Sequence, residues 1–147
     1  MKKGFSLVEV VMSIATLAII SGFVLEMFFV GTTLNAKARD LDFATNIAVN
    51  SIELFKSCDS LEEYIGYYKS FEVGNSSAKI KKYYDENWEG ATANGASFAL
   101  EVVCEGAGGN LAGELYYIQS IVTDTRDTDD IKTIVNLKTA KYLKNIF

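Results

Sequence analysis

The sequence predicts an α+β fold in which a long N-terminal helix packs against a small antiparallel β-sheet of about three or more strands. A helical pattern without proline runs from about residue 5 to residue 55. Segments rich in β-branched and aromatic residues follow near the C-terminus, as expected for strands. Short glycine-rich and aspartate-rich segments separate them, which favours tight connections between antiparallel neighbours.

The predicted helix has two halves of different character. From Phe5 to Leu25 the residues form an apolar run that would measure about 31 Å as a helix, close to the hydrocarbon thickness of a membrane. Beyond this run, apolar residues recur at spacings of three and four, which predicts an amphipathic face. These residues are Leu34, Ala38, Leu41, Ala44, Ala48, Ile52 and Phe55. We therefore expect a hydrophobic half at 5–31 and a second half at 32–56 that packs on a partner.

A globular domain is expected at 32–147, in which a connecting region at 57–96 joins the helix to a sheet at 97–147. Asp59 and Ser60 predict the start of a short helix that continues to about Lys69. The segments 75–77 and 90–95 have the composition of loops. The three candidate strands are Ser97–Cys104, Leu115–Thr123 and Ile131–Leu143.

Composition narrows the class of function. The formal net charge is −5, and an acidic chain argues against a dedicated nucleic-acid surface. The chain has no histidine, which excludes histidine metal sites, Ser-His-Asp catalysis and a Cys-His pair. We therefore expect a protein that is not an enzyme and that needs no cofactor and no metal ion.

Cys58 and Cys104 are the only cysteines of the chain. If the domain lies outside the cytoplasm, a disulfide between them is permitted, and closing that loop would stabilise the fold by about 4 kcal/mol. The alternative is two separate buried thiols that behave as small apolar residues. The sequence leaves both alternatives open.

Three other motifs have simple structural explanations. The glycine-rich segment 105–113 lacks the spacing of a phosphate-binding loop and is expected to be a hairpin connection. The aspartates at 124–130 lack the turn glycine and final glutamate of a calcium loop. The third motif is a small basic-aromatic patch of Lys79, Lys81, Lys82, Tyr83 and Tyr84. Such patches can stack single-stranded bases, but a lysine-edged surface segment is commoner.

The first nine residues combine a cationic leader with a carboxylate inside the apolar run. Lys2 and Lys3 precede Gly4, and Glu9 lies four residues beyond Phe5. A secretory signal peptide would end in a small-residue cleavage site and would not carry a carboxylate in its apolar region. A simple anchor has no need of a glutamate that costs about 1–3 kcal/mol in a bilayer segment. The two lysines favour a cytoplasmic leader, with the bulk of the chain outside.

The segment Gly-Phe-Ser-Leu-Val-Glu at residues 4–9 resembles the cleavage region of type IV prepilins and type II secretion pseudopilins. The resemblance implies that prepilin peptidase removes the leader 1–4 by cutting between Gly4 and Phe5, and that the new amino terminus on Phe5 is methylated. Loss of the two lysines would take the formal charge from −5 to −7. The resemblance also implies that Glu9 pairs with the Phe5 amine of a neighbouring subunit during assembly, a use of a buried polar pair to set registry.

The stretch from Ala44 to Lys56 looks like the helix of minor pilins and of I-type pseudopilins. The resemblance thus implies a structural, minor subunit of a type IV pilus with a role in the tip or initiation complex, and so in adhesion or twitching motility. Such a subunit is a single-pass cytoplasmic-membrane protein before assembly and lies in an extracellular filament afterwards. Two alternatives stay open: a pseudopilin of a type II secretion or competence system in a periplasmic or cell-wall pseudopilus, and a tip-displayed adhesin or DNA-uptake receptor.

The resemblance implies partners for membrane insertion, processing and assembly. They are other pilin subunits, both major and minor, prepilin peptidase, the inner-membrane assembly platform and membrane lipid before assembly. Nucleic acid is a partner only under the alternative of a DNA-uptake receptor.

Overall fold

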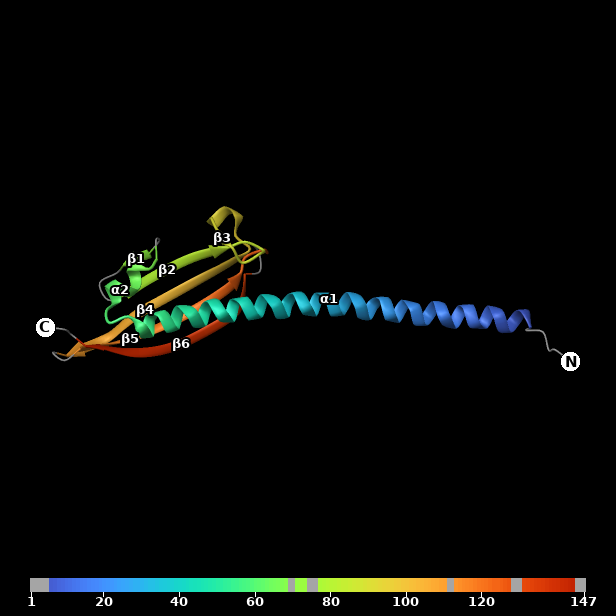
Figure 1. Cartoon of the computed structure of the whole chain (residues 1–147), viewed down its shortest axis with the longest axis horizontal. Coiled ribbons are helices and arrows are strands. Elements are labelled where there is room, and N and C mark those ends of the chain that lie inside the picture. The colour runs from blue at the N-terminus through green and yellow to red at the C-terminus, as the bar shows by residue number, and fades with distance from the viewer. Residues whose placement is uncertain (1–5, 69–70, 74–76, 111–112, 128–130, 145–147) are drawn as a thin grey trace. The chain divides into compact units, whose positions relative to one another are not determined.

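The computed structural model describes residues 6–68, 71–73, 77–110, 113–127 and 131–144. The chain divides into two units, Met1–Asp40 and Leu41–Phe147. Helix α1 (Leu7–Ser57) begins in the first unit and ends in the second. The other elements all lie in the second unit (Figure 1). They are α2 (Leu61–Gly66), β1 (Phe71–Val73), β2 (Ser77–Tyr84), β3 (Gly90–Ala91), the 3₁₀ turn η1 (Ala93–Gly95), β4 (Phe98–Asn110), β5 (Gly113–Asp124) and β6 (Lys132–Lys144).

The strands form one antiparallel sheet in the order β1-β2-β4-β5-β6, and β3 pairs with the end of β2. β4, β5 and β6 follow one another as hairpins, so the α+β class and the predicted antiparallel meander are confirmed. The glycine-rich segment 105–113 is part of the β4–β5 hairpin, in which the register shifts between Gly106 and Gly109. Strand pairing extends further into this segment than the sequence suggests.

The sheet begins earlier in the chain than predicted, because β1, β2 and β3 all lie within the expected connecting region at 57–96. The prediction of that region was wrong for a physical reason. On the inner face of β2, Ala78, Ile80 and Tyr84 are buried, whereas Lys82 between them is exposed. A cation at an inner position breaks the apolar alternation by which a half-buried strand is recognised.

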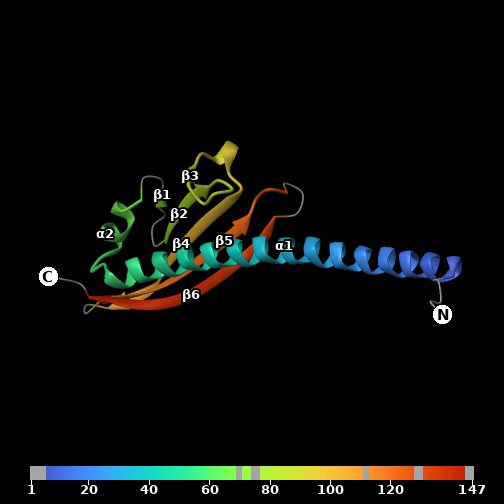
Figure 2. The same cartoon turned by 45° about the vertical axis from the view of Figure 1, so that its right-hand side comes forward.

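The second half of α1 lies along one face of the sheet (Figure 2). Ala44, Ala48 and Phe55 are fully buried there, as the predicted stripe requires. The buried stripe begins further along the helix than predicted, since Leu34 and Leu41 are 59% and 49% exposed, and Ala38 is exposed as well. The helical period continues into the first unit, but every core residue described belongs to the second.

Helix α2 begins where the sequence predicts. The Ser60 side chain accepts a hydrogen bond of 3.1 Å from the Glu63 amide, and the Glu63 carboxylate accepts one of 2.8 Å from the Asp59 amide. This reciprocal pair is similar to a capping box, with the Asp59 amide in place of the amide of the N-cap residue Ser60. The helix ends at Gly66, earlier than expected, and Lys69 lies outside the described residues.

Tyr64 joins α2 to α1. Its ring is completely buried and meets Phe55 edge to face, with the ring centroids 5.2 Å apart. Its hydroxyl lies 2.9 Å from Ser51 Oγ and 3.4 Å from the Tyr68 hydroxyl. Burial raises the pKa of Tyr64 above its usual value, so the phenol stays protonated and keeps these contacts.

The end of α1 is fixed by a lysine from β6. The Lys141 ammonium donates to the Lys56 carbonyl at 2.7 Å and also to the Cys58 carbonyl. The last carbonyls of a helix lack partners within it and carry partial negative charge, so a cation there is stabilising. Residues 85 positions apart in the chain are joined in this way.

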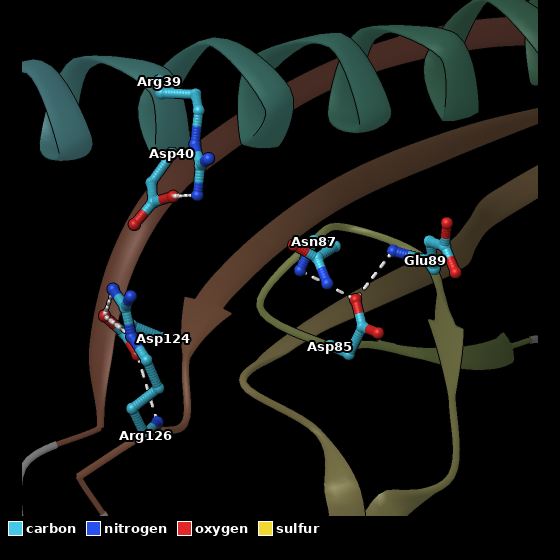
Figure 3. Close-up of polar contacts among 7 residues, drawn as sticks. All are labelled: Arg39, Asp40, Asp85, Asn87, Glu89, Asp124 and Arg126. Atoms are coloured by element: carbon cyan, nitrogen blue, oxygen red, sulfur yellow. Dashed lines mark hydrogen bonds and ion pairs between the residues drawn. The ribbon is translucent and has the colours of Figure 1, made fainter.

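The turn between β2 and β3 places a buried tryptophan. The Asp85 carboxylate accepts hydrogen bonds from the amides of Asn87 and Glu89 at 2.8 and 2.9 Å (Figure 3). Trp88 within this turn has φ of 65°, a left-handed conformation that costs about 1–2 kcal/mol for a residue with a side chain. Its ring stacks on Phe98 with centroids 4.0 Å apart, and this burial offsets the strain.

Arg126 contacts the same Phe98 ring from the β5–β6 connection. Its guanidinium carbon lies 4.6 Å from the ring centroid, and its Nη2 donates to Asp124 at 2.6 Å (Figure 3). The hydrogen bond from Arg126 lowers the pKa of the Asp124 carboxyl. Asp124 therefore forms a local ion pair with Arg126. Asp129 and Asp130 of the same sequence segment lie outside the described residues.

Two buried serines should respond to substitution in opposite directions. Ser120 Oγ in β5 is buried without a hydrogen-bond partner among the described residues, whereas Ser51 Oγ bonds to Tyr64. We expect Ser120→Ala to raise the free energy of unfolding by about 1 kcal/mol, because it removes an unpaired polar group. Ser51→Ala should lower it by about 1–2 kcal/mol, because it leaves the buried Tyr64 hydroxyl with poorer bonding.

Urea titration of the full chain in detergent, followed by the fluorescence of Trp88, measures both changes. The contradictory result is a loss of stability in Ser120→Ala as large as that in Ser51→Ala.

Candidate functional site

The N-terminal half of α1 carries apolar side chains around its whole circumference. The most apolar window of the helix has a mean hydropathy of 2.2, and none of it is buried. Long apolar side chains are exposed by 44–81% along this half. They are Leu7, Val8, Val10, Val11, Met12, Ile14, Leu17, Ile19, Ile20, Phe23, Val24, Leu25, Met27, Phe28, Phe29 and Val30. By length and composition, α1 could cross a membrane.

The hydroxyl groups in this half are turned back onto the helix. Ser13 donates to the Glu9 carbonyl at 2.7 Å and Ser21 to the Leu17 carbonyl at 2.8 Å. Thr16, Thr32 and Thr33 donate to backbone carbonyls three or four residues earlier in the same way. Because these hydroxyls are satisfied locally, they do not hinder contact with an apolar environment.

Two carboxylates interrupt the apolar surface. Glu9 lies in the first turn of α1, where the partial positive charge of the helix start favours an anion. Its side chain is exposed and makes no ion pair with another described residue. Glu26 lies 17 residues further along, about 26 Å at 1.5 Å per residue. The apolar residues between the two carboxylates thus span most of a hydrocarbon core.

Gly4 and Phe5, the predicted cleavage site and methylation site, lie outside the described residues. The structure therefore places Glu9 but not the Phe5 amine with which the sequence resemblance pairs it. Of the predicted assembly and processing residues, the structure places Glu9 alone, an exposed carboxylate in the first turn of the apolar half of α1.

The two cysteines are both buried and both free. Cys58 follows the last turn of α1 and donates from Sγ to the Leu54 carbonyl at 3.1 Å, and Cys104 lies in β4 on the inner face of the sheet. Burial raises the pKa of the Cys104 thiol to about 12. Burial, followed by the Glu63 carboxylate, raises the pKa of Cys58. Thiols of this kind are unreactive packing groups.

The basic-aromatic patch predicted from the sequence lies on β2, where successive residues face opposite sides of the sheet. Lys79 and Lys81 pair with Glu101 of β4 at 2.7 and 3.6 Å. Lys82 faces the other side and lies over the Tyr84 ring, 5.2 Å from its centroid. Among the described residues, no group of three or more metal-binding side chains is found.

None of the protein families, curated proteins or solved structures compared with this chain matches it.

The free thiols predict a specific labelling pattern. In the folded protein at about pH 8, iodoacetamide should modify neither Cys58 nor Cys104, because burial keeps both protonated and inaccessible. After denaturation without a reducing agent, both should be modified. Intact mass spectrometry counts the added groups, and an unmodified denatured chain would instead reveal a Cys58–Cys104 disulfide.

Proposed function

We propose that the chain is a membrane-anchored, minor structural subunit of a type IV pilus that polymerises through the N-terminal half of α1. The observation that carries this proposal is an apolar helix surface, exposed on all sides, with a carboxylate in its first turn. The resemblance of residues 4–9 to the prepilin cleavage region is the reason for assigning that surface to pilus assembly. The peptidase, sister pilins and assembly platform are the partners that this function requires.

The exposed apolar side chains need a cover other than water. Burying a large aliphatic or aromatic side chain is worth about 1.5–3 kcal/mol, so the apolar side chains from Leu7 to Val30 represent on the order of 30 kcal/mol. Before assembly the bilayer supplies that cover. In a filament the same helix surface is covered by the helices of neighbouring subunits, and the transfer from lipid to a helix bundle keeps it dry.

Glu9 specifies where along the filament axis the helix comes to rest when it moves from lipid into the helix bundle. Cleavage after Gly4 creates an amine on Phe5 with an ordinary pKa of about 8, so the amine is positively charged. A lone amine and a lone carboxylate are each unfavourable in an apolar bundle, and each lowers the cost of the other when they pair. Pairing of Glu9 with the Phe5 amine of the adjacent subunit would fix the axial position of the incoming helix. The Glu9 carboxylate thus determines the axial position of the subunit in the filament and contributes less to the strength of subunit binding.

The second unit, which begins at Leu41, is the part that the filament displays. Its core is built from α2, the sheet and the second half of α1, and none of the described core residues comes from the apolar half. A subunit of this kind can fold outside the membrane while its anchor remains in the bilayer. We therefore place the second unit on the extracytoplasmic side before assembly and on the filament surface afterwards.

The assembly role of Glu9 predicts a selective defect. Glu9→Gln keeps the shape of the side chain and removes its charge, so the fold should be unchanged while incorporation into filaments falls at least tenfold. The reduction follows from an unpaired Phe5 amine in an apolar bundle. Quantitative immunoblotting of sheared filaments against the membrane fraction measures incorporation.

Glu26→Gln is the matched control, because it makes the same change at the other end of the apolar segment. It should leave incorporation within twofold of the parent. Normal incorporation of Glu9→Gln would refute the pairing role, and an equal defect in both variants would point to a general effect of charge on the helix.

A further inference from the structure

A groove of about 840 Å³ opens between α1 and the β2 side of the sheet, entirely within the second unit. α1 contributes Asn50 to its wall, and the chain just after α2 contributes Tyr67. β2 contributes Lys82 and Tyr83, and Leu100 of β4 lies in the apolar part of the lining. The volume falls in the range of ordinary small-molecule sites.

The charge of the groove is opposite to that of the chain. No aspartate or glutamate is found among the described lining residues, although the chain has 19 acidic residues and a net charge of −5. Lys81 and Lys82 both line the groove. Lys81 is neutralised in part by Glu101, whereas Lys82 forms no ion pair with a described residue and lies over the Tyr84 ring. Lys82 is therefore the cation available to an incoming anion.

The remaining polar groups of the lining are suited to a ligand with hydroxyl groups. The Asn50 amide and the Tyr67 hydroxyl make no hydrogen bond to other described residues. They provide donors and acceptors in several directions. Tyr67 is also 62% exposed, so its ring is accessible for stacking against the C–H face of a sugar ring.

We propose that this groove binds a sugar unit that carries a carboxylate, a uronate being the simplest. The Lys82 ammonium binds the carboxylate, the Asn50 amide and the Tyr67 hydroxyl bond the sugar hydroxyls, and the Tyr67 ring covers the C–H face of the sugar. A small ligand with a carboxylate is attracted by the positive charge of the groove and does not reach the acidic surface around it. A long polyanion such as nucleic acid would extend beyond the groove and be repelled by that acidic surface. None of these residues belongs to the apolar half of α1, so binding is separable from assembly.

Isothermal titration calorimetry of the full chain in neutral detergent tests the site. The probe is trigalacturonate, and its methyl ester is the matched uncharged ligand. Trigalacturonate should bind at least tenfold more tightly than the ester, since the ester lacks the charge-assisted contact. Lys82→Gln should weaken trigalacturonate binding about tenfold and leave binding of the ester unchanged.

Lys138→Gln is the matched protein control, because Lys138 is an exposed lysine of β6 outside the groove. It removes one positive charge and should change the affinity by less than twofold. Amide chemical shifts on addition of trigalacturonate should map to Asn50, Tyr67 and Tyr83.

Four results would overturn the proposal. They are equal affinity for the acid and its ester, an equal loss in Lys82→Gln and Lys138→Gln, no measurable binding at about 10 mM trigalacturonate, and tighter, Lys82-dependent binding of oligothymidylate. The last result would assign the groove to single-stranded nucleic acid.

Discussion

The constraint on which this structure depends is that one helix carries two surfaces requiring different surroundings. The apolar half of α1 is exposed on all sides, with its hydroxyl groups bonded to its own backbone. The second half buries Ala44, Ala48 and Phe55 against the sheet. Exposure of an apolar surface of that size to water is unfavourable, and by its length and composition the helix could cross a membrane. In that setting Glu9 stands out, because an apolar anchor has no structural use for a carboxylate.

The second unit holds its part of α1 through contacts of three different kinds. The side chains of Ala44, Ala48 and Phe55 are fully buried in the core that the helix shares with the sheet. Tyr64 joins α2 to α1 through its ring and its hydroxyl. Lys141 of β6 bonds to the carbonyls at the helix end. The helix is therefore fixed along its side and at its terminus by residues that are distant in sequence.

The sequence predicts the parts of this fold that depend on regular residue spacing. It does not predict the parts whose structure depends on one particular contact. The helix and the three C-terminal strands follow from periodicity and β propensity. β2 was missed because Lys82 occupies an inner position of the strand, and that same lysine lines the groove. The predicted stripe begins at Leu34, because helical periodicity does not show where the sheet that covers the helix ends. The roles of Lys141 and of the left-handed Trp88 are invisible to pattern analysis, since each depends on a residue far away in the chain or on a rare backbone conformation. For the proposed assembly site, the sequence supplies Glu9 and its apolar setting, and the structure adds the exposure of that surface.

We propose that α1 belongs to a processed subunit that assembles through its N-terminal half. The most direct test is the intact mass, with N-terminal fragmentation, of the protein extracted from the membranes of cells that produce it naturally. If the leader is removed as proposed, the chain begins at Phe5, lacks the four residues before it and carries one added methyl group on the new amine. A chain that retains Lys2 and Lys3, or one cut beyond the apolar segment, would contradict it.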